Sequence, residues 1–218
     1  NVSVPVPGQS PSSTLGILAL FTLITLGPSL LIMTTGFARI LIVLGFLRNA
    51  MGTPQTPPNQ VLVGFSLFLT LFVMAPTFGR VNDEALKPYL DSRISATQAI
   101  DNAQVPLRGF MLKQTGASEL KLFVKLSRQE QPRTADDVKM TTLIPAFMVS
   151  ELKTAFQIGV LIYIPFLIID LVVASTLMSM GMMMLPPAMI SLPFKLLLFV
   201  LVDGWGLLAQ NLVAGFHT

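Results

Sequence analysis

The chain has 218 residues, of which 52% are hydrophobic and 11% charged, with a net charge of +3 and a mean hydropathy of +0.71. Soluble domains are about one quarter charged, so this composition favours a membrane protein or a very apolar assembly, and the small net charge does not favour nucleic-acid binding. Cysteine is absent, which excludes disulfides and thiolate sites, and the single histidine, His217, cannot form a metal site alone, so we expect no metal and no cofactor.

The N-terminal third consists of a polar stretch followed by two apolar segments. Residues 1–14 are polar and rich in Pro and Ser. Residues 15–47 are long enough for a tilted membrane span, or for a helix that is broken at the Gly-Pro pair at 27–28. A proline-rich loop separates them from the uncharged apolar run at 61–78. We therefore predict a first hydrophobic helical hairpin over residues 15–78.

The middle segment, residues 79–141, holds 18 of the 25 charged residues. Phe110 and Phe123 each belong to a set of apolar side chains spaced by three and four residues, which is typical of packed helices. Thr134 and Asp137 have the spacing of a capping box that opens the next helix. This segment is predicted to be a small helical domain outside the membrane, packed through Phe110 and Phe123.

The last segment, residues 142–218, is predicted to form a second hydrophobic hairpin. Its apolar runs cover residues 143–177 and 182–202, and the prolines at 186–187 and at 193 are expected to break the second run. The fold class is therefore an all-α membrane protein with two helical hairpins flanking a small helical extramembrane domain.

Polar side chains interrupt the start of the third apolar run. Ser150, Lys153, Thr154 and Gln157 follow the spacing of one helix face, and Glu151 flanks it. Such a stripe either lines an aqueous path or contacts another subunit. The alternative is that this helix end lies at the membrane surface, with the Lys153 ammonium reaching water.

Three further charges lie among apolar neighbours. Asp170 and Lys195 are expected to pair with each other or with groups on another subunit. Arg39 lies deeper, where an unpaired Arg costs a few kcal/mol on insertion scales. Asp203 is expected at a helix end.

Methionine is concentrated in one short stretch. Six of the twelve methionines lie within residues 178–189, among them Met182, Met183 and Met184, which directly precede Leu185 and a Pro-Pro turn. Methionine is unbranched and conformationally soft, so a ring of such loops could close a pore and still deform around a passing chain. The alternative is that these methionines are ordinary core filler.

No pattern of residues points to catalysis. The chain lacks H-E-x-x-H, G-x-S-x-G and P-loop motifs, and the S-x-x-K match at 150–153 lacks its S-D-N and K-T-G partners. We therefore expect that the protein is not an enzyme.

Two stretches carry a family resemblance. Residues 145–160 (PAFMVSELKTAFQIGV) and 193–205 (PFKLLLFVLVDGW) resemble the two signatures of the FliP family of type III secretion export-gate proteins. The order of apolar and polar segments is also similar. A virulence-type homologue of the SctR kind shares these signatures, and a start at Asn1, as after removal of a signal peptide, favours the flagellar branch.

The resemblance implies a location and a set of partners. The protein would lie in the bacterial inner membrane at the flagellar basal body, with its middle domain periplasmic. About five copies would form a ring with FliQ-like and FliR-like subunits, and this complex would conduct unfolded export substrates.

The resemblance also implies roles for individual residues. Met182, Met183 and Met184 would form the channel gasket. Contacts between subunits or with the export path are expected from Glu151, Lys153, Gln157 and Lys195, and ring contacts are a second possibility for Phe110 and Phe123. A solute or ion transporter, with Glu151, Asp170 and Lys195 binding or relaying protons, is the alternative from another class.

Overall fold

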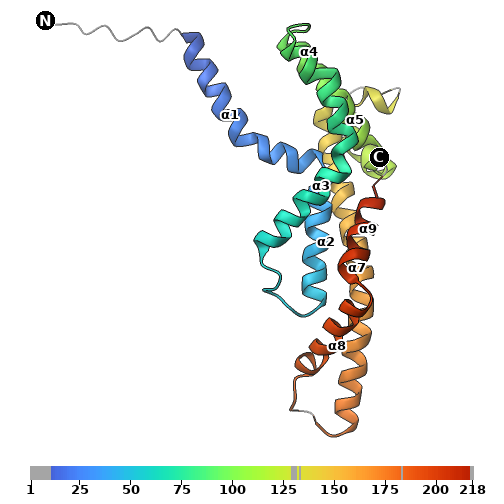
Figure 1. Cartoon of the computed structure of the whole chain (residues 1–218). Coiled ribbons are helices and arrows are strands. Elements are labelled where there is room, and N and C mark those ends of the chain that lie inside the picture. Colours follow the sequence, from blue (N-terminus) through green and yellow to red (C-terminus); the bar gives the residue numbers. More distant parts are fainter. Residues whose placement is uncertain (1–10, 129–131, 133, 183, 217–218) are drawn as a thin grey trace, which may run out of the picture.

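The computed structural model describes residues 11–128, 132, 134–182 and 184–216, and every regular element in these ranges is helical, as predicted (Figure 1). In chain order the elements are α1 (Pro11–Thr34), α2 (Phe37–Ala50), α3 (Asn59–Val81), the π-helical turn η1 (Asn82–Leu86), α4 (Lys87–Leu90), α5 (Ala96–Gln114), α6 (Ala117–Leu126), the 3-10 turn η2 (Ala135–Asp137), α7 (Met140–Ser179), α8 (Pro187–Leu201) and α9 (Gly204–Ala214).

The 40-residue helix α7 runs through most of the length of the molecule (Figure 1). Helix α2 packs along it and also against α3, and α8 folds back on the far end of α7. Helices α5 and α6 pack against the beginning of α7, while α1 leaves the body at an angle. The elements therefore form an elongated bundle with a polar end, an apolar arm made by α7 and α8, and one projecting helix.

Two helical segments are long and apolar enough to cross a membrane, namely α7 and the continuous rod Asn59–Leu90 that joins α3, η1 and α4. Two bent helix pairs raise the count to four if each pair is one span. These are the end of α1 with α2, bent by 75°, and α8 with α9, bent by 63°. The expected membrane character is thus confirmed.

The first apolar run is broken, but not at 27–28. Helix α1 continues through Pro28 and ends at Thr34. A proline ring also clashes with the Cβ of the residue before it, and Gly27 has no Cβ, so this part of the conflict is absent. The break lies instead at Gly36, where a Cβ would lie 2.6 Å from ring carbons of Phe216. A tertiary contact with the other end of the chain accompanies the bend, and no local sequence rule predicts such a contact.

In the last apolar run, too, one of the expected helix breaks at a proline is absent. The break at 186–187 is confirmed, because α8 begins at Pro187 with a proline in its first turn. The expected break at Pro193 is wrong, because this residue lies inside α8. Its missing N–H costs one helix hydrogen bond, to the carbonyl of Met189, and the helix continues beyond it.

The polar segment shares the main core of the molecule. Phe110 and Met111 of α5 are buried among side chains of the apolar helices, and the Phe110 ring packs edge-on against Phe147 at 6.0 Å. Phe123 on α6 is half-buried. The predicted capping box forms, with the Thr134 amide donating to Asp137 Oδ2 at 2.9 Å, but it opens the short turn η2 and not a long helix.

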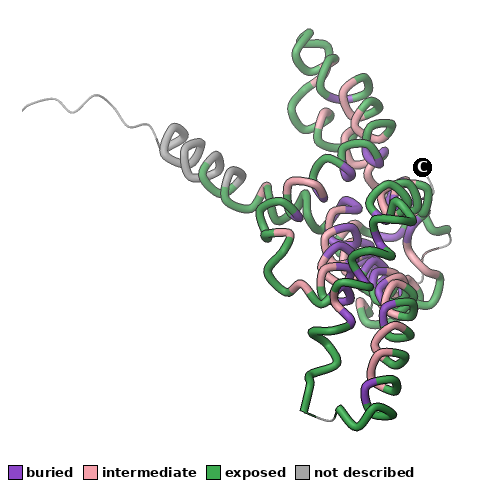
Figure 2. Tube along the Cα trace, turned by 60° about the horizontal axis from the view of Figure 1, so that its bottom comes forward, coloured by how far each residue is buried: buried purple, intermediate pink, exposed green. Residues whose placement is uncertain are grey.

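The core lies where α2, α3, α5, α7 and α9 meet, and Figure 2 shows few buried residues along the far half of the α7–α8 arm. Its fully buried members include Ile40, Val43, Leu44, Met74, Met111, Leu143 and Phe147. Close packing of α2 on α7 relies on Gly159, where a Cβ would lie 2.5 Å from the ring of Phe46.

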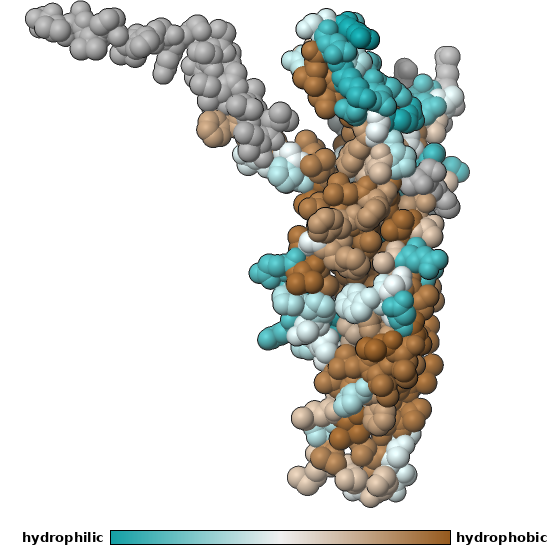
Figure 3. All heavy atoms as spheres, in the orientation of Figure 1, coloured by the Kyte–Doolittle hydropathy of each residue, from teal (hydrophilic) through white to brown (hydrophobic). Residues whose placement is uncertain are grey.

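The remaining apolar side chains cover much of the surface. Figure 3 shows hydrophobic residues over the middle of the molecule and the α7–α8 arm, with hydrophilic residues at the α4–α5 end. Phe72 on α3 and Leu201 on α8 are 71% and 74% exposed. Apolar surface on this scale indicates contact with lipid or with other protein chains.

Candidate functional site

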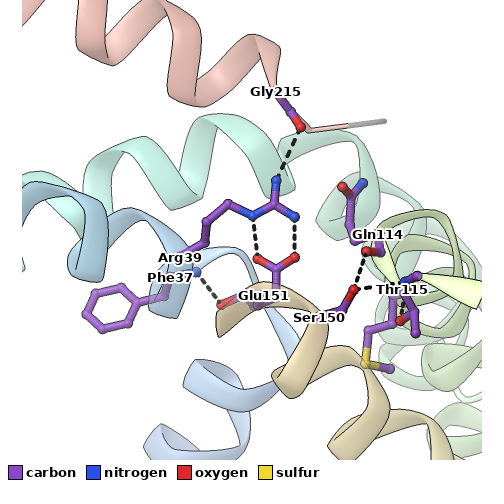
Figure 4. A network of polar contacts seen from close by, with 10 residues as sticks. Phe37, Arg39, Gln114, Thr115, Ser150, Glu151 and Gly215 are labelled. Atoms are coloured by element: carbon purple, nitrogen blue, oxygen red, sulfur yellow. Dashed lines mark hydrogen bonds and ion pairs between the residues drawn. The ribbon is translucent and has the colours of Figure 1, made fainter. Parts of the chain in front are cut away.

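A buried ion pair joins the two halves of the chain. Arg39 of α2 lies opposite Glu151 of α7, and its guanidinium donates to both carboxylate oxygens, with 2.9 Å from Nε to Oε2 (Figure 4). The third nitrogen, Nη1, donates to the carbonyl of Gly215 at 3.2 Å. Both side chains are almost fully buried, at 4% and 0% exposure. The Arg39 side chain therefore has every nitrogen paired inside the chain.

This pairing removes most of the cost expected for Arg39. A bidentate Arg–carboxylate contact satisfies several donors and acceptors at once. Taking both charges out of water remains costly, so the pair contributes little net stability, whereas removal of one partner typically costs about 3–5 kcal/mol. The pair therefore fixes which faces of α2 and α7 meet.

A second polar cluster attaches α5 and α6 to α7. The hydroxyl of Ser150 accepts a hydrogen bond from the Gly116 amide at 2.8 Å and donates to the carbonyl of Gln114 at 3.3 Å. One turn along α7, the Lys153 ammonium donates to Glu119 Oε1 at 2.8 Å. The first two residues of the predicted polar stripe, Ser150 and Lys153, therefore bind the polar segment of the same chain.

The environment of Glu119 favours its charged form. Hydrogen bonds from Lys153, Ser118 and its own backbone amide lower the pKa of Glu119 from 4.5 to about 2. The Lys153 side chain is 54% exposed, so solvent screens this pair more than it screens the Arg39 pair.

A third cluster ties the α7–α8 arm to the end of α2. Lys195 of α8 donates to Asp170 Oδ2 at 2.7 Å and to the carbonyl of Ala50 at 3.3 Å. Ser191, one turn before Lys195, donates to Asp170 Oδ1 at 2.6 Å. Of the two partners expected for Asp170 and Lys195, the chain forms the contact between them.

The methionine loop lies between two fixed helix ends. Helix α7 stops in a Schellman motif, in which Gly181 has φ +76° and the Met182 amide donates to the carbonyl of Leu177 at 3.0 Å. Helix α8 then begins at Pro187. Between them Met182 is 41% and Met184 99% exposed, whereas Met183 lies outside the described residues. The predicted turn is present, and the side chains of Met182 and Met184 are exposed.

An apolar groove lies beside the third cluster. It has a volume of about 650 Å³ and runs between α7 and the α8–α9 bend, with Leu47 of α2 at its edge. Its lining is almost wholly aliphatic and aromatic, so it suits an apolar helix or lipid chain and not a polar metabolite.

The structure groups the predicted site residues into separate places. Glu151 and Lys195 lie in different buried clusters, Lys153 lies beside the polar segment, and Gln157 is exposed on α7. Their predicted contacts with other subunits stay predictions. Within the described residues, no three His, Asp or Glu side chains gather into a metal site.

Sequence reasoning offered the Asp170–Lys195 pair as one possibility but missed the other partners in these clusters. It noted Arg39 but assigned no partner, and it did not single out Glu119 or Ser191. The charge balance of the apolar segments could have indicated the ion pairs. Apart from Lys153, these segments contain two cations, Arg39 and Lys195, and two anions, Glu151 and Asp170. Equal numbers of buried opposite charges favour pairing within the chain.

Comparisons with known proteins agree on one family. The FliP family model matches residues 20–212. "Flagellar biosynthetic protein FliP" of Bacillus subtilis (strain 168) is 54% identical over 208 residues, which are 95% of this chain and 94% of the relative. The protein of the same name from Caulobacter vibrioides is 57% identical over 201 residues, covering 92% and 76%. That from Aquifex aeolicus is 48% identical over 203 residues, covering 92% and 85%.

Proposed function

Because the chain belongs to the FliP family of flagellar biosynthetic proteins, we propose that it is a core subunit of the flagellar type III export gate. In this role it forms, with FliQ-like and FliR-like subunits, the entry channel through which unfolded flagellar proteins leave the cytoplasm. The observation that carries the proposal is family membership over almost the whole chain, including every cluster described above.

The exposed apolar surface supports a ring assembly. Apolar side chains cover the outer face of α3 and most of the α7–α8 arm. Contiguous apolar patches of this extent mark interaction surfaces or lipid contact. We propose that about five copies bury these faces against each other and against the FliQ-like and FliR-like subunits in the inner membrane, at the flagellar basal body.

The proposed orientation follows from the family resemblance, and the polar end is compatible with it. The α4–α5 end is charged and carries exposed ion pairs such as Lys87–Asp83, so it suits an aqueous compartment. We assign it to the periplasm, and the methionine loop at the opposite end of α7 then lies toward the cytoplasm. The hairpins formed by α2 with α3 and by α7 with α8 flank this polar part along the chain.

The methionine loop is the proposed gasket of the closed channel. Met182 and Met184 are exposed between two rigid helix ends, so copies of the loop around an axis would bring soft apolar side chains together. Replacing Met182–Met184 with Ala should raise ion leakage through the assembled complex, measured as conductance in planar bilayers. Conductance equal to that of the unaltered complex would contradict a gasket.

The charges within the apolar segments are proposed to be positioning groups and not transport sites. In the described part of the chain, Arg39, Glu151, Asp170 and Lys195 each have an ionic partner in the same chain. This pairing does not favour a solute or ion transporter, whose binding groups must be free to meet the solute. We assign no catalytic role to any residue.

A clean gene deletion tests the proposal directly. Loss of filament protein export and of swimming motility, both restored by the gene supplied in trans, is the expected result. Normal motility with loss of virulence-type secretion would instead favour the SctR-like branch. Normal export of both kinds would contradict the proposed function.

A further inference from the structure

The C-terminal end of the described chain is enclosed by residues from the N-terminal half. Phe216 is only 5% exposed although it follows the last helix. Its ring stacks on Phe110 of α5 at 6.3 Å with an interplanar angle of 23°. The Arg39 guanidinium carbon lies 4.0 Å from the centre of the same ring. Such an arrangement combines aromatic packing with a cation–π contact.

The same ring touches the bend between α1 and α2. A Cβ at Gly36 would lie 2.6 Å from two ring carbons of Phe216, so no larger residue fits without moving the ring. Helix α1 bends by 75° from α2 at this point. Phe216 therefore packs directly against the bend.

The backbone next to Phe216 is held as well. The Gly215 carbonyl accepts the hydrogen bond from Arg39 Nη1, while the other two nitrogens of Arg39 bind Glu151. The last residues of the chain thus complete the site around a buried charge on α2.

We infer that Gly215 and Phe216 form a clasp that fixes the bend between α1 and α2, and with it the direction in which α1 leaves the body. Without the ring, the bend loses the aromatic side chain that packs on Gly36, and the contacts of α1 with α2 and α7 hold its angle less firmly. Phe216 is a positioning residue in this sense.

The clasp has a consequence for assembly, which rests on the proposed function. The described part of α1 carries exposed apolar side chains, among them Phe21 at 65% and Leu31 at 56% exposure. A neighbouring copy can bind that face only if α1 points in a fixed direction.

Thiol labelling of the purified full chain in detergent tests the clasp. The chain has no cysteine, so Thr35→Cys introduces a single thiol at the bend, where Thr35 is 3% exposed. Adding Phe216→Ala should speed maleimide labelling of this thiol by roughly tenfold, because the local structure opens more often. The matched control is Ala50→Cys, also 3% exposed, at the other end of α2, about 20 Å away by the helix rise.

Two outcomes of this comparison would overturn the clasp. Unchanged labelling at Thr35→Cys would show that the ring does not hold the bend. Equal acceleration at Thr35→Cys and Ala50→Cys would show that Phe216 is a general core residue whose loss loosens the whole chain.

A compensating pair of substitutions gives an independent measurement. Gly36→Ala should speed labelling at Thr35→Cys, because the added methyl displaces the ring. Phe216→Leu removes the ring carbons that lie closest to Gly36, so the double variant should label more slowly than Gly36→Ala alone. A double variant that labels as fast as Gly36→Ala, or faster, would contradict direct contact. These rates are read on a single chain, so they do not depend on whether the protein serves in export.

Discussion

Arg39 and Glu151 show how a charge can be held between two apolar helices. Each guanidinium nitrogen has an oxygen partner, and the carboxylate is fully buried. The sequence shows that Arg39 is an isolated charge in an apolar run. It does not show that Glu151 pairs with it, because the two residues are 112 positions apart. Pairings at such separations follow from the packing of helices and not from any local pattern.

Replacing Glu151 with Gln should destabilise the chain by about 3–5 kcal/mol, because it leaves the Arg39 charge buried beside a neutral amide. The free energy of unfolding of the purified chain, titrated with denaturing detergent, measures this loss. Asp83→Asn is the matched control, since the Lys87–Asp83 pair is exposed on both sides and its loss should change stability far less. Similar losses in the two variants would contradict a special role for the buried pair.

The pair between Glu119 and Lys153 makes the docking of α6 on α7 dependent on pH. Because the folded pKa of Glu119 is lowered from 4.5 to about 2, the charged carboxylate stabilises the fold fully above pH 4.5. That contribution is lost as the pH falls through about 2. The gap in thermal midpoint between the wild type and Glu119→Gln should therefore be constant near neutral pH and shrink between pH 4.5 and 2. A gap that widens on acidification would contradict this assignment.

At the scale of elements, the ends of α7 and α8 define the methionine loop. Gly181 takes φ +76°, a conformation that costs residues with a Cβ about 1–2 kcal/mol. Gly181→Ala should therefore lower the free energy of unfolding by about 1 kcal/mol, and Gly181→Asn by less, because Asn tolerates this conformation better.

Gly45 of α2 provides the control for this substitution. It lies inside a helix with open space around it, so Gly45→Ala should stabilise the isolated chain by about 0.5–1 kcal/mol. Opposite signs for the two Gly→Ala variants, measured by the same denaturation, are the expected result. Stabilisation by Gly181→Ala would show that the chain does not hold the Schellman motif.

The existence of the helices could be predicted from the sequence, whereas some of their breaks could not. Apolar runs of span length and the capping pattern at Thr134 are local properties, and both appear in the structure. Of the prolines considered as helix breaks, those at 186–187 do separate two helices, whereas Pro28 and Pro193 lie inside helices. The break at Gly36 coincides with contact to Phe216, which lies 180 residues further along the chain. Local sequence rules describe the propensity of a segment to form or to break a helix. Tertiary contacts determine where the chain departs from that propensity.

At the scale of the whole molecule, the single chain is an incomplete packing unit. Its main core lies where five helices meet, with a smaller cluster between α2, α7 and α8, while the outer face of α3 and much of the α7–α8 arm remain exposed. On α3, each residue that is buried within the chain has an exposed neighbour in sequence. The helix therefore carries side by side the residues that pack inside the chain and the residues that can contact another chain or lipid. Phe72 is 71% exposed and Val73 is 1% exposed, although they are adjacent.

This adjacency separates folding from assembly in one experiment. Phe72→Glu and Val73→Glu add the same charge at nearly the same depth, so any cost of membrane insertion is matched. Val73→Glu should unfold the chain because it buries an unpaired carboxylate, which makes the chain sensitive to trypsin. Phe72→Glu should leave trypsin resistance intact but prevent the ring from forming with FliQ-like and FliR-like subunits, as seen by native electrophoresis. Rings at normal yield from Phe72→Glu would mean that this face of α3 meets lipid or water in the complex and not another subunit.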